Sequence, residues 1–584
     1  MNKWLRAVGI VVLVIIIIYG IIAINLYSSV GRFPTGFPRP APAIKSLVWP
    51  TIGYPELVAP GSEMSAEVYL PRVSGRSGTF TAILKPVRPE LAGLEYSMGA
   101  QAYAVGASEH WPKGTRFGEA DVWRIRFALP PRAVPELYDL TVTAALGGGQ
   151  VTDTQPHAVS VTHAGADKAF TFVSLADIHV HQRNISGFMT PQSNKGIAPD
   201  GTPVFFERAI EEVNLLRPDF VVMLGDYVRA QTYAGEYQPE FANFYKSLAR
   251  FRVPVFMVAG NHDAYYNEVD GVRVYEENIG PLFYSFDAGT AHFTAVNTNQ
   301  WPARDRMMME KFNLFVYPRK WQGQVAVATD ERKPETYRGQ LAWLRDDLAA
   351  HQGSSVRFMF MHHDPFRPKG KAVAWRNERF GALYTLGGGG LGSTALKELS
   401  AKYRVGYVMT GHWHSDYIDR IPWIDRDGFA SFVNQTMVTY DEGGMKDSYP
   451  GYRTWNVQGK EVTDYTYLDT FHSVPLYDGS VLNGMTDLDR LDRPAISLAR
   501  GLGAPSAFYV DSYLGEAMEV RGLTGVFPAR SAHKVANGEL YQAVPLPSNP
   551  SLELLYIRAR VGAGVPGTDS ATPGDPAKVI VTVD

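Results

Sequence analysis

Short apolar runs that end in polar residues recur through the middle of the chain. Residues 221–224 read Val-Val-Met-Leu and continue into Gly225 and Asp226. An uninterrupted apolar run of this kind is typical of a parallel strand that is covered on both faces. Gly225 permits a sharp turn at the end of the strand. Because ligands bind at the carboxyl ends of strands in open α/β sheets, we expect Asp226 to lie in a functional site.

Four further runs show the same pattern, and each leads into Asp, Asn or His. They are 170–175 before Asp177 and His179, 255–258 before Asn261, His262 and Asp263, 356–360 before His362 and His363, and 405–409 before His412 and His414. Oxygen and imidazole ligands suit borderline metals such as Mn, Fe, Zn or Co. The chain has no cysteine, so disulfides and thiolate metal sites are excluded.

Helical periodicity separates several of these strands. Phe206, Ile210, Val213 and Leu216 lie on one face of a helix predicted over residues 204–216. Strands that alternate with helices predict a parallel sheet and an α/β fold. Further helices are predicted over about 239–251, from Gln340 onwards and over 394–403, and residues 280–286 begin an antiparallel continuation.

The regions before and after these strands and helices have a different periodicity, in which apolar residues recur at every second position. Trp123, Ile125 and Phe127 alternate with arginines, which together with glycine- and proline-rich turns predicts a β-sandwich over residues 44–165. It looks like the immunoglobulin or fibronectin type. Leu555 and Ile557 alternate in the same way, and we expect a C-terminal β domain over residues 473–584. The α/β domain then covers residues 166–472.

The first 31 residues have another character. No charge occurs from Ala7 to Val30, and Lys3 and Arg6 precede this apolar run. The run is long enough for a membrane helix of about 20 residues, and the two charges predict a cytoplasmic N-terminus with the remaining chain outside. The alternatives are a cleaved signal peptide, whose small-residue cleavage site is not evident, and a buried soluble helix. Residues 32–43 form a proline-rich spacer.

Composition adds little about partners. The 584 residues allow two to four domains. A formal net charge of −3 gives no argument for a nucleic-acid partner, and nothing indicates an oligomeric state.

The polar residues, taken in order, resemble the calcineurin-like metallophosphoesterase family from about Phe170 to Tyr467. The matching motifs are Asp177-Ile178-His179, Gly225-Asp226, Gly260-Asn261-His262-Asp263, His362-His363 and Gly411-His412-Trp413-His414. The resemblance implies a four-layer fold in which mixed β-sheets are flanked by helices. It also implies a hydrolase of phosphate mono- or diesters with two metal ions, which clamp the phosphoryl group and activate a water to hydroxide.

The resemblance also assigns roles to individual residues. One metal would be bound by Asp177, His179, Asp226 and His414, and the other by Asp226, Asn261, His362 and His412. Asp226 would bridge the two ions. His262 would face the substrate, and Asp263 would orient His262.

Some assignments stay open. His363 is either a packing residue or supports a ligand, and His181 is either a loop residue or a metal contact. Purple acid phosphatases have a metal-bound tyrosine three residues after the bridging aspartate, where this chain has Arg229, so a tyrosinate site is not expected. The competing class is a surface binding or structural protein with an idle site.

Overall fold

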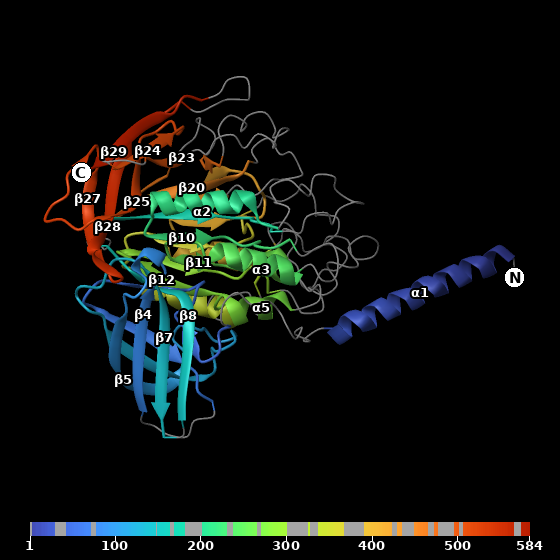
Figure 1. Ribbon diagram of the computed structural model, residues 1–584. Helices are drawn as coiled ribbons and strands as arrows, with labels where there is room; N and C mark the ends of the chain where they lie inside the picture. Colours follow the sequence, from blue (N-terminus) through green and yellow to red (C-terminus); the bar gives the residue numbers. More distant parts are fainter. Residues whose placement is uncertain are drawn as a thin grey trace.

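The structure is a computed structural model in which four parts of the chain can be recognised (Figure 1). They are an N-terminal helix, an N-terminal β unit (residues 43–163), a central domain (169–476) and a C-terminal β unit (496–584). The described residues are 3–29, 43–71, 78–147, 149–163, 169–180, 201–229, 237–264, 270–300, 325–327, 337–366, 390–422, 429–434, 438, 449–464, 472–476, 496–501, 506–565 and 574–584.

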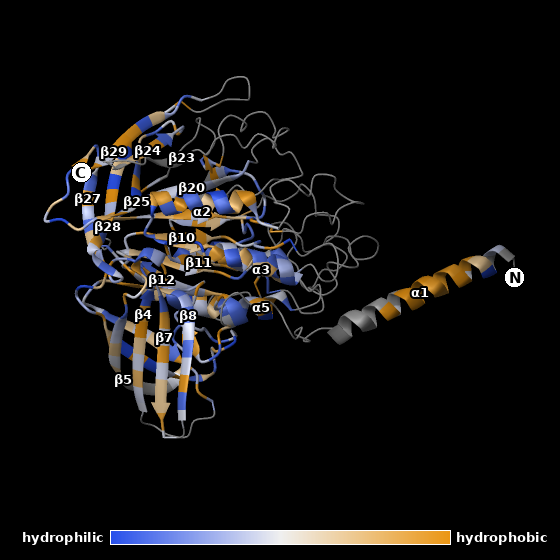
Figure 2. Cartoon of the chain, viewed as in Figure 1, coloured by the Kyte–Doolittle hydropathy of each residue, from blue (hydrophilic) through white to orange (hydrophobic). Residues whose placement is uncertain are grey.

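Helix α1 (Lys3–Ser29) stands apart from the other elements, and its middle is strongly apolar (Figures 1 and 2). Ile10, Ile17 and Ile21 are 63, 51 and 61% exposed. Within the described part of the chain, no helix combines the length and the apolar character that crossing a membrane requires. The membrane anchor predicted for residues 1–31 is therefore not supported here and stays a prediction. The predicted spacer lies outside the described residues except for Ala43.

The N-terminal β unit forms one hydrogen-bonded sheet in the order β1-β3-β6-β5-β4-β7-β8-β2. Its elements are β1 (Leu47–Trp49), β2 (Glu56–Val58), β3 (Glu63–Val68), β4 (Gly78–Pro86), η1 (Pro89–Leu91), β5 (Tyr96–Ala107), β6 (Asp121–Ala128), β7 (Leu137–Leu146) and β8 (Gly149–Val161). On β6, Ile125 and Phe127 are buried and Arg126 is exposed, as the alternation predicts.

This sheet curls until its ends approach each other. The Asp153 carboxylate on β8 accepts the backbone N–H groups of Ser46 and Leu47 at 2.8 and 2.9 Å. One apolar core receives side chains from β1 through β8, including Leu47, Val58 and Val159. The predicted β structure is confirmed, whereas two separate sheets of the immunoglobulin or fibronectin type are not.

The central domain contains two mixed sheets that face each other. The first, in the order β11-β10-β9-β20-β21, consists of β9 (Ala169–Leu175), β10 (Phe220–Met223), β11 (Val255–Met257), β20 (Gly451–Gln458) and β21 (Glu461–Asp464), with β22 (Val474–Pro475) paired to β20. The second, in the order β12-β13-β15-β17-β19-β18, consists of β12 (Tyr284–Ala288), β13 (Ala291–Ala295), β15 (Arg357–Phe360), β17 (Tyr407–Thr410), β18 (Tyr417–Pro422) and β19 (Phe429–Asn434). A small pair is formed by β14 (Val325–Ala326) and β16 (Gly390–Leu391).

Aromatic side chains fill the space between the two sheets. The Phe172 ring of β9 lies 5.4 Å from Phe293 and 5.5 Å from Phe358, measured between ring centroids. Helices α2 (Val204–Leu216) and α3 (Tyr237–Leu248) cover the outer face of the first sheet. Helices α7 (Gly339–Ala350) and α9 (Ser393–Lys402) cover the second. The predicted four-layer α/β fold is therefore confirmed. The domain also contains the short helices α4 (Asn261–Ala264) and α5 (Gly271–Asn278).

The predicted helices agree closely with the observed ones. Helix α2 has the predicted bounds. Helix α3 begins and ends two to three residues before the predicted 239–251. The helix ends earlier than predicted because the N–H groups of Arg250 and Phe251 donate to the carbonyl oxygens three residues back, those of Ser247 and Leu248. Such bonds tighten the last turn.

The C-terminal β unit contains the sheets β23-β24-β29-β26 and β25-β28-β27. Their strands are β23 (Ile496–Gly501), β24 (Ser506–Ser512), β25 (Met518–Pro528), β26 (Val535–Ala536), β27 (Glu539–Leu546), β28 (Asn549–Val561) and β29 (Ala577–Val583). Leu523 and Leu555 share one apolar core with Ile210 and Val213 of α2. The C-terminal β unit is thus packed on the central domain. This is possible because the apolar side chains of α2 are not confined to the face that contacts the first sheet. The boundary predicted at residue 473 falls too early, since β22 pairs with β20.

Candidate metal centre

The carboxyl ends of five parallel strands bring the predicted ligands together. Strands β9, β10 and β11 are parallel neighbours in the first sheet, and β15 and β17 in the second. Asp177 and His179 follow β9, Asp226 follows β10, Asn261 follows β11, His362 follows β15, and His412 and His414 follow β17. All seven residues converge where these strands end.

Asp177, His179 and His414 form one group. The His414 Nε2 atom lies 3.4 Å from Asp177 Oδ1 and 3.2 Å from His179 Nε2. His179 Nε2 is 3.8 Å from both Asp177 Oδ1 and Asp226 Oδ2. Two ligand atoms that each bind one ion at roughly 2.0–2.2 Å lie about 3–3.5 Å apart, so this spacing fits a shared metal.

A second group surrounds the other side of Asp226. His362 Nε2 lies 3.1 Å from Asp226 Oδ2 and 2.9 Å from Asn261 Oδ1. The His412 ring centroid lies 5.1 Å from that of His362. Asp226 therefore lies between both groups, as a bridging carboxylate requires.

Burial and mutual proximity shift the pKa values of the ligand side chains. Asp177, Asp226 and His362 are at most 1% exposed. Burial opposes ionisation of Asp226, but the neighbouring His362 and His262 lower its pKa below the ordinary value. Burial likewise opposes protonation of His362, yet the Asp226 carboxylate raises the pKa of His362 to about 9. The buried carboxylates thus attract positive charge, and a metal cation meets that demand.

Backbone conformation also marks these residues. Asp177, His179, Asp226, His412 and His414 all have positive φ, between 48° and 71°. Residues other than glycine rarely adopt this left-handed region, and such conformations cluster at functional sites. The surrounding structure must therefore hold these loops in place.

Two glycines permit the loops to approach closely. Gly225 has φ of +94°, and a Cβ atom there would lie 2.6 Å from the Gly260 nitrogen. A Cβ atom on Gly260 would lie 2.1 Å from Asp226 Oδ1. Any side chain at either position would displace the bridging carboxylate or the loop that carries Asn261.

The second ring nitrogen of His362 is bound to the backbone. Its Nδ1 lies 2.7 Å from the Leu224 carbonyl oxygen, to which it donates. Histidines that bind metals usually donate the other N–H in this way, which fixes the tautomer and the ring orientation. Nε2 is left for the ion.

Asp263 does not orient His262, so that prediction is wrong. One Asp263 oxygen accepts the backbone N–H groups of Asp226 and Gly260, each at 2.8 Å. The other accepts the N–H of Tyr227 at 2.9 Å. Asp263 instead holds the loop of Asp226, because turns past two adjacent strands present several backbone donors at one place.

His262 is oriented by the backbone carbonyl of Arg229, which lies 2.6 Å from Nδ1. Its Nε2 lies 3.9 Å from Asp226 Oδ2. Burial lowers the pKa of His262 to about 3, so the ring is neutral near pH 7. That His262 faces the substrate stays a prediction.

His363 and Tyr227 lie next to the centre with other partners. His363 Nδ1 is 3.0 Å from the Thr298 hydroxyl, and the His363 ring is 4.6 Å from that of His412. The Tyr227 hydroxyl donates to the Val258 carbonyl oxygen within the sheet. His181 lies outside the described residues.

Sequence reasoning missed two contributors to the centre. Thr298 follows β13 exactly as the ligands follow their strands, with an apolar run and then Asn297-Thr298-Asn299. Asp416 follows His414 by two residues, and it is only 2% exposed. The strand-end pattern could have identified Thr298, whereas a single Asp in a loop gives no local signal.

A separate cluster of Asp287, His292 and His351 also contains metal-ligand types. His292 Nδ1 lies 2.8 Å from Asp287 and Nε2 lies 3.0 Å from Asp347. The His292 and His351 rings stack in parallel at 3.7 Å, and a ring lone pair lies in the plane of its ring. Two parallel rings cannot both direct lone pairs at one ion, so this cluster is an ion-pair network.

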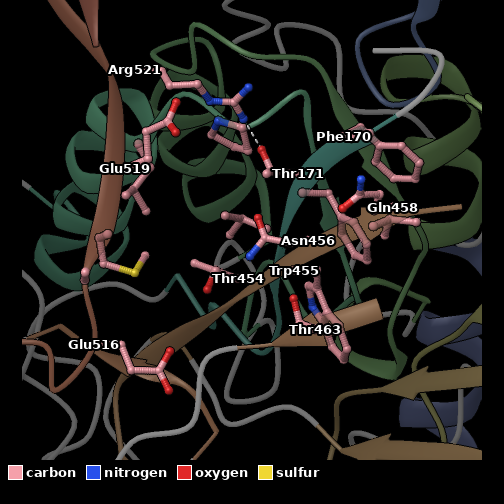
Figure 3. A pocket seen from close by; sticks show the side chains of 18 of the residues that line it. Phe170, Thr171, Thr454, Trp455, Asn456, Gln458, Thr463, Glu516, Glu519 and Arg521 are labelled. Atoms are coloured by element: carbon pink, nitrogen blue, oxygen red, sulfur yellow. Dashed lines mark hydrogen bonds between the residues drawn. The ribbon is translucent and has the colours of Figure 1, made fainter. Parts of the chain in front are cut away.

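A cavity of 560 Å³ lies near the opposite end of β9 from Asp177, between β20 and the C-terminal β unit (Figure 3). Thr171, Asn456 and Glu519 line it, and Arg521 reaches across to Thr171 and Asp219. None of the predicted ligands lines this cavity, so it is distinct from the metal centre.

Three comparisons with known proteins were made, and the one with sequence families covers the site. The sequence profile of the family described as calcineurin-like phosphoesterase matches residues 170–416. The matched region begins within β9 and ends two residues after His414. Among solved structures, a purple acid phosphatase from yellow lupin (Lupinus luteus) seeds is similar, with 14% identity, a TM-score of 0.38, and coverage of 71% of this chain and 72% of that chain. A search among curated proteins finds no similar sequence.

Proposed function

We propose that this chain hydrolyses phosphate mono- or diesters at a dinuclear metal centre held by Asp177, His179, Asp226, Asn261, His362, His412 and His414. The observation that carries the proposal is the position of the buried Asp226 carboxylate between two groups of ligand types. The match of residues 170–416 to a phosphoesterase family supports the reaction class.

A bound pair of metal ions supplies an activated water and positive charge for in-line displacement at phosphorus. The chain's own residues set the geometry of that reaction. Asp226 would keep the two ions close despite their repulsion. The Leu224 carbonyl keeps the His362 ring in one orientation, and the Asp263 carboxylate keeps the Asp226 loop in place.

His262 would contact the substrate through Nε2, which is unprotonated in the neutral ring and can therefore accept a proton but not supply one at the start of the reaction. The Arg229 carbonyl holds its Nδ1–H, so Nε2 is directed towards the bridging carboxylate. His262→Asn should lower kcat by roughly 100-fold, the usual contribution of a general acid or base, and leave the metal content unchanged. Loss of metal from this variant would make His262 a ligand instead.

Asp226→Asn is the decisive variant. It removes the bridging charge, so metal content by mass spectrometry and phosphate release should both fall. A matched control is Asp287→Asn, in the ion-pair network away from the centre, which should retain both. If Asp226→Asn loses metal but the wild type releases no phosphate from any ester, the chain is a binding or structural protein with an idle site.

The ester class requires a direct comparison of substrates. The wild-type chain, loaded in turn with Mn, Fe, Zn or Co, should be assayed against phosphate monoesters, diesters and nucleotides. Turnover of one class at least about ten times faster than the others would define the substrate class. Equal, trace activity on all of them would contradict a phosphoesterase function.

We further propose that the N-terminal segment of residues 1–31 anchors the chain in a membrane, with the central domain outside the cytoplasm. Support comes from the uncharged run between Ala7 and Val30 and from Lys3 and Arg6 before it. The full chain should sediment with membranes and resist extraction by high salt. A soluble product that begins after residue 30 would show that the segment is cleaved and the enzyme secreted.

A further inference from the structure

The buried carboxylate of Asp416 joins the loop of His412 and His414 to distant parts of the chain. Its Oδ2 accepts the backbone N–H groups of His472 at 2.6 Å and Ser473 at 2.7 Å. Its Oδ1 accepts the Ser473 hydroxyl at 3.0 Å. The loop after β17 is therefore tied to the segment that precedes β22.

The same carboxylate binds two side chains near the start of β20. It pairs with the Arg453 guanidinium and accepts the Tyr449 hydroxyl. Arg453 is fully buried, and Asp416 is 2% exposed. A buried ion pair with this many hydrogen bonds holds its partners in one arrangement, because removing either charge leaves the other without compensation.

This network leads directly to the other side of the metal centre. Arg453 lies in register with Ser174 of β9, three residues before Asp177. The Asp177 carboxylate in turn accepts the backbone N–H of His412, at 2.9 Å from Oδ2. Asp416 thus connects the loop of His414 to the strand beside the one that carries Asp177.

The loop that Asp416 holds is also the one that most needs support. His412 and His414 both have positive φ, 71° and 53°. The His414 side chain is 22% exposed, whereas that of Asp177 is fully buried. A partly exposed ligand on a strained backbone keeps its position only if the surrounding contacts determine it.

We propose that Asp416 is a positioning residue for the metal that Asp177, His179, Asp226 and His414 would bind. This inference rests on the proposed dinuclear centre and names a residue that controls the occupancy of one of its two sites. In the other site, Asn261 and His362 follow strands to which Asp416 forms none of the hydrogen bonds given above, and only His412 lies on the Asp416 loop, two residues farther from Asp416 than His414. The effect of losing Asp416 should therefore be larger at the first site.

The test is metal binding to the full chain carrying Asp416→Asn, measured with Mn²⁺ by calorimetry and by metal content after dialysis. One of the two ions should bind about 10- to 100-fold more weakly, the usual effect of altering a group that orients a ligand. The other ion, which has only His412 on this loop, should be weakened less. Phosphate release should recover when Mn²⁺ is raised to saturation.

Tyr449→Phe provides a milder variant if Asp416→Asn does not fold, since it removes one hydrogen bond to Asp416 and keeps the ring. It should weaken the same ion by a smaller factor. Glu136→Gln is the matched control, because it breaks another buried ion pair far from the ligands. It should lower stability and leave both metal affinities unchanged.

The possible outcomes separate the two proposals. Wild-type affinity for both ions in a destabilised Asp416→Asn chain would overturn the positioning role. Equal weakening of both ions would also overturn it. A wild-type chain that binds two ions without hydrolysing any ester contradicts only the proposed function, whereas a wild-type chain that binds no metal contradicts both.

Discussion

The metal centre and the junction around Glu136 both bury carboxylates, but they compensate the charge differently. At the junction, Glu136 lies 2.7 Å from Arg88 and 3.3 Å from Arg217, and it accepts the Tyr556 hydroxyl at 2.7 Å. At the metal centre, imidazoles and backbone N–H groups lie against the Asp226 carboxylate. One cluster therefore contains permanent cations of its own, whereas the other contains imidazoles, which carry a positive charge only when they are protonated.

This difference separates a structural cluster from a functional one. Burial raises the pKa of Glu136, but Arg217 and Arg88 more than offset this and hold its pKa below the ordinary value. Arg88 and Glu136 belong to the N-terminal β unit, Arg217 ends α2, and Tyr556 belongs to the C-terminal β unit. The junction thus joins all three units. A buried carboxylate alone does not identify a functional site. A buried carboxylate that lacks a permanently charged partner and so favours an external cation does identify one.

Removal of the metal ions should have the largest effect of the changes considered, and it should affect activity and not the fold. Dialysis against a chelator should reduce phosphate release by roughly 1,000-fold or more, because the metal ions supply several kcal/mol of transition-state stabilisation. The fold should persist, since the ligand loops are held by protein hydrogen bonds such as those of Asp263. Circular dichroism and an ester assay before and after adding metal back would check this. Full activity in the chelated protein would contradict it.

Glu136→Gln should have the opposite effect: it should lower stability and leave activity unchanged. The variant leaves Arg88 and Arg217 buried without their anion, so the free energy of unfolding should fall by about 3–5 kcal/mol. Urea denaturation would measure this, and kcat at saturating metal should not change. Glu95→Gln, which breaks the exposed pair with Lys85, should cost less than about 1 kcal/mol. Equal effects of the two variants would refute the structural role of the junction.

The His292 network should make stability depend on pH. Burial opposes its protonation, but hydrogen bonds to Asp287 and Asp347 raise the pKa of His292 to about 9. Since the folded pKa lies above the unfolded value of 6.5, the contribution is complete below pH 6.5 and is lost as pH rises through about 9. Its size is about 3 kcal/mol. Urea denaturation between pH 6 and 10 should show the loss, and Asp287→Asn should reduce it.

At the junction, a smaller effect than that of Glu136→Gln is expected from Tyr556→Phe. This change removes one hydrogen bond to Glu136 and leaves both arginine pairs. The free energy of unfolding should fall by about 1.5 kcal/mol, as for a hydrogen bond to a charged group. Tyr509→Phe, on the exposed side of β24, is the control and should be close to neutral. A loss as large as that of Glu136→Gln would mean that the hydroxyl, not the ion pairs, holds the junction.

Local patterns determined the candidate ligands and most of the central domain. Each ligand follows an apolar run within a few residues, and strands with this pattern end at one edge of a sheet. The α2 helix was predictable for the same reason, because its apolar spacing is contained in thirteen residues. The order and the motifs of these residues resemble the calcineurin-like metallophosphoesterase family, and this resemblance implied which metal each residue would bind.

Tertiary structure alone decided which groups meet. Asp263 follows His262 directly, yet its oxygens bond to the backbone near Asp226, 37 residues away. Asp416 meets Arg453, and Glu136 meets Tyr556 across 420 positions. The curled N-terminal sheet and the shared core of the C-terminal β unit depend on such contacts as well. Periodicity reports which side of an element is buried, but it contains no information about which distant surface will cover that side.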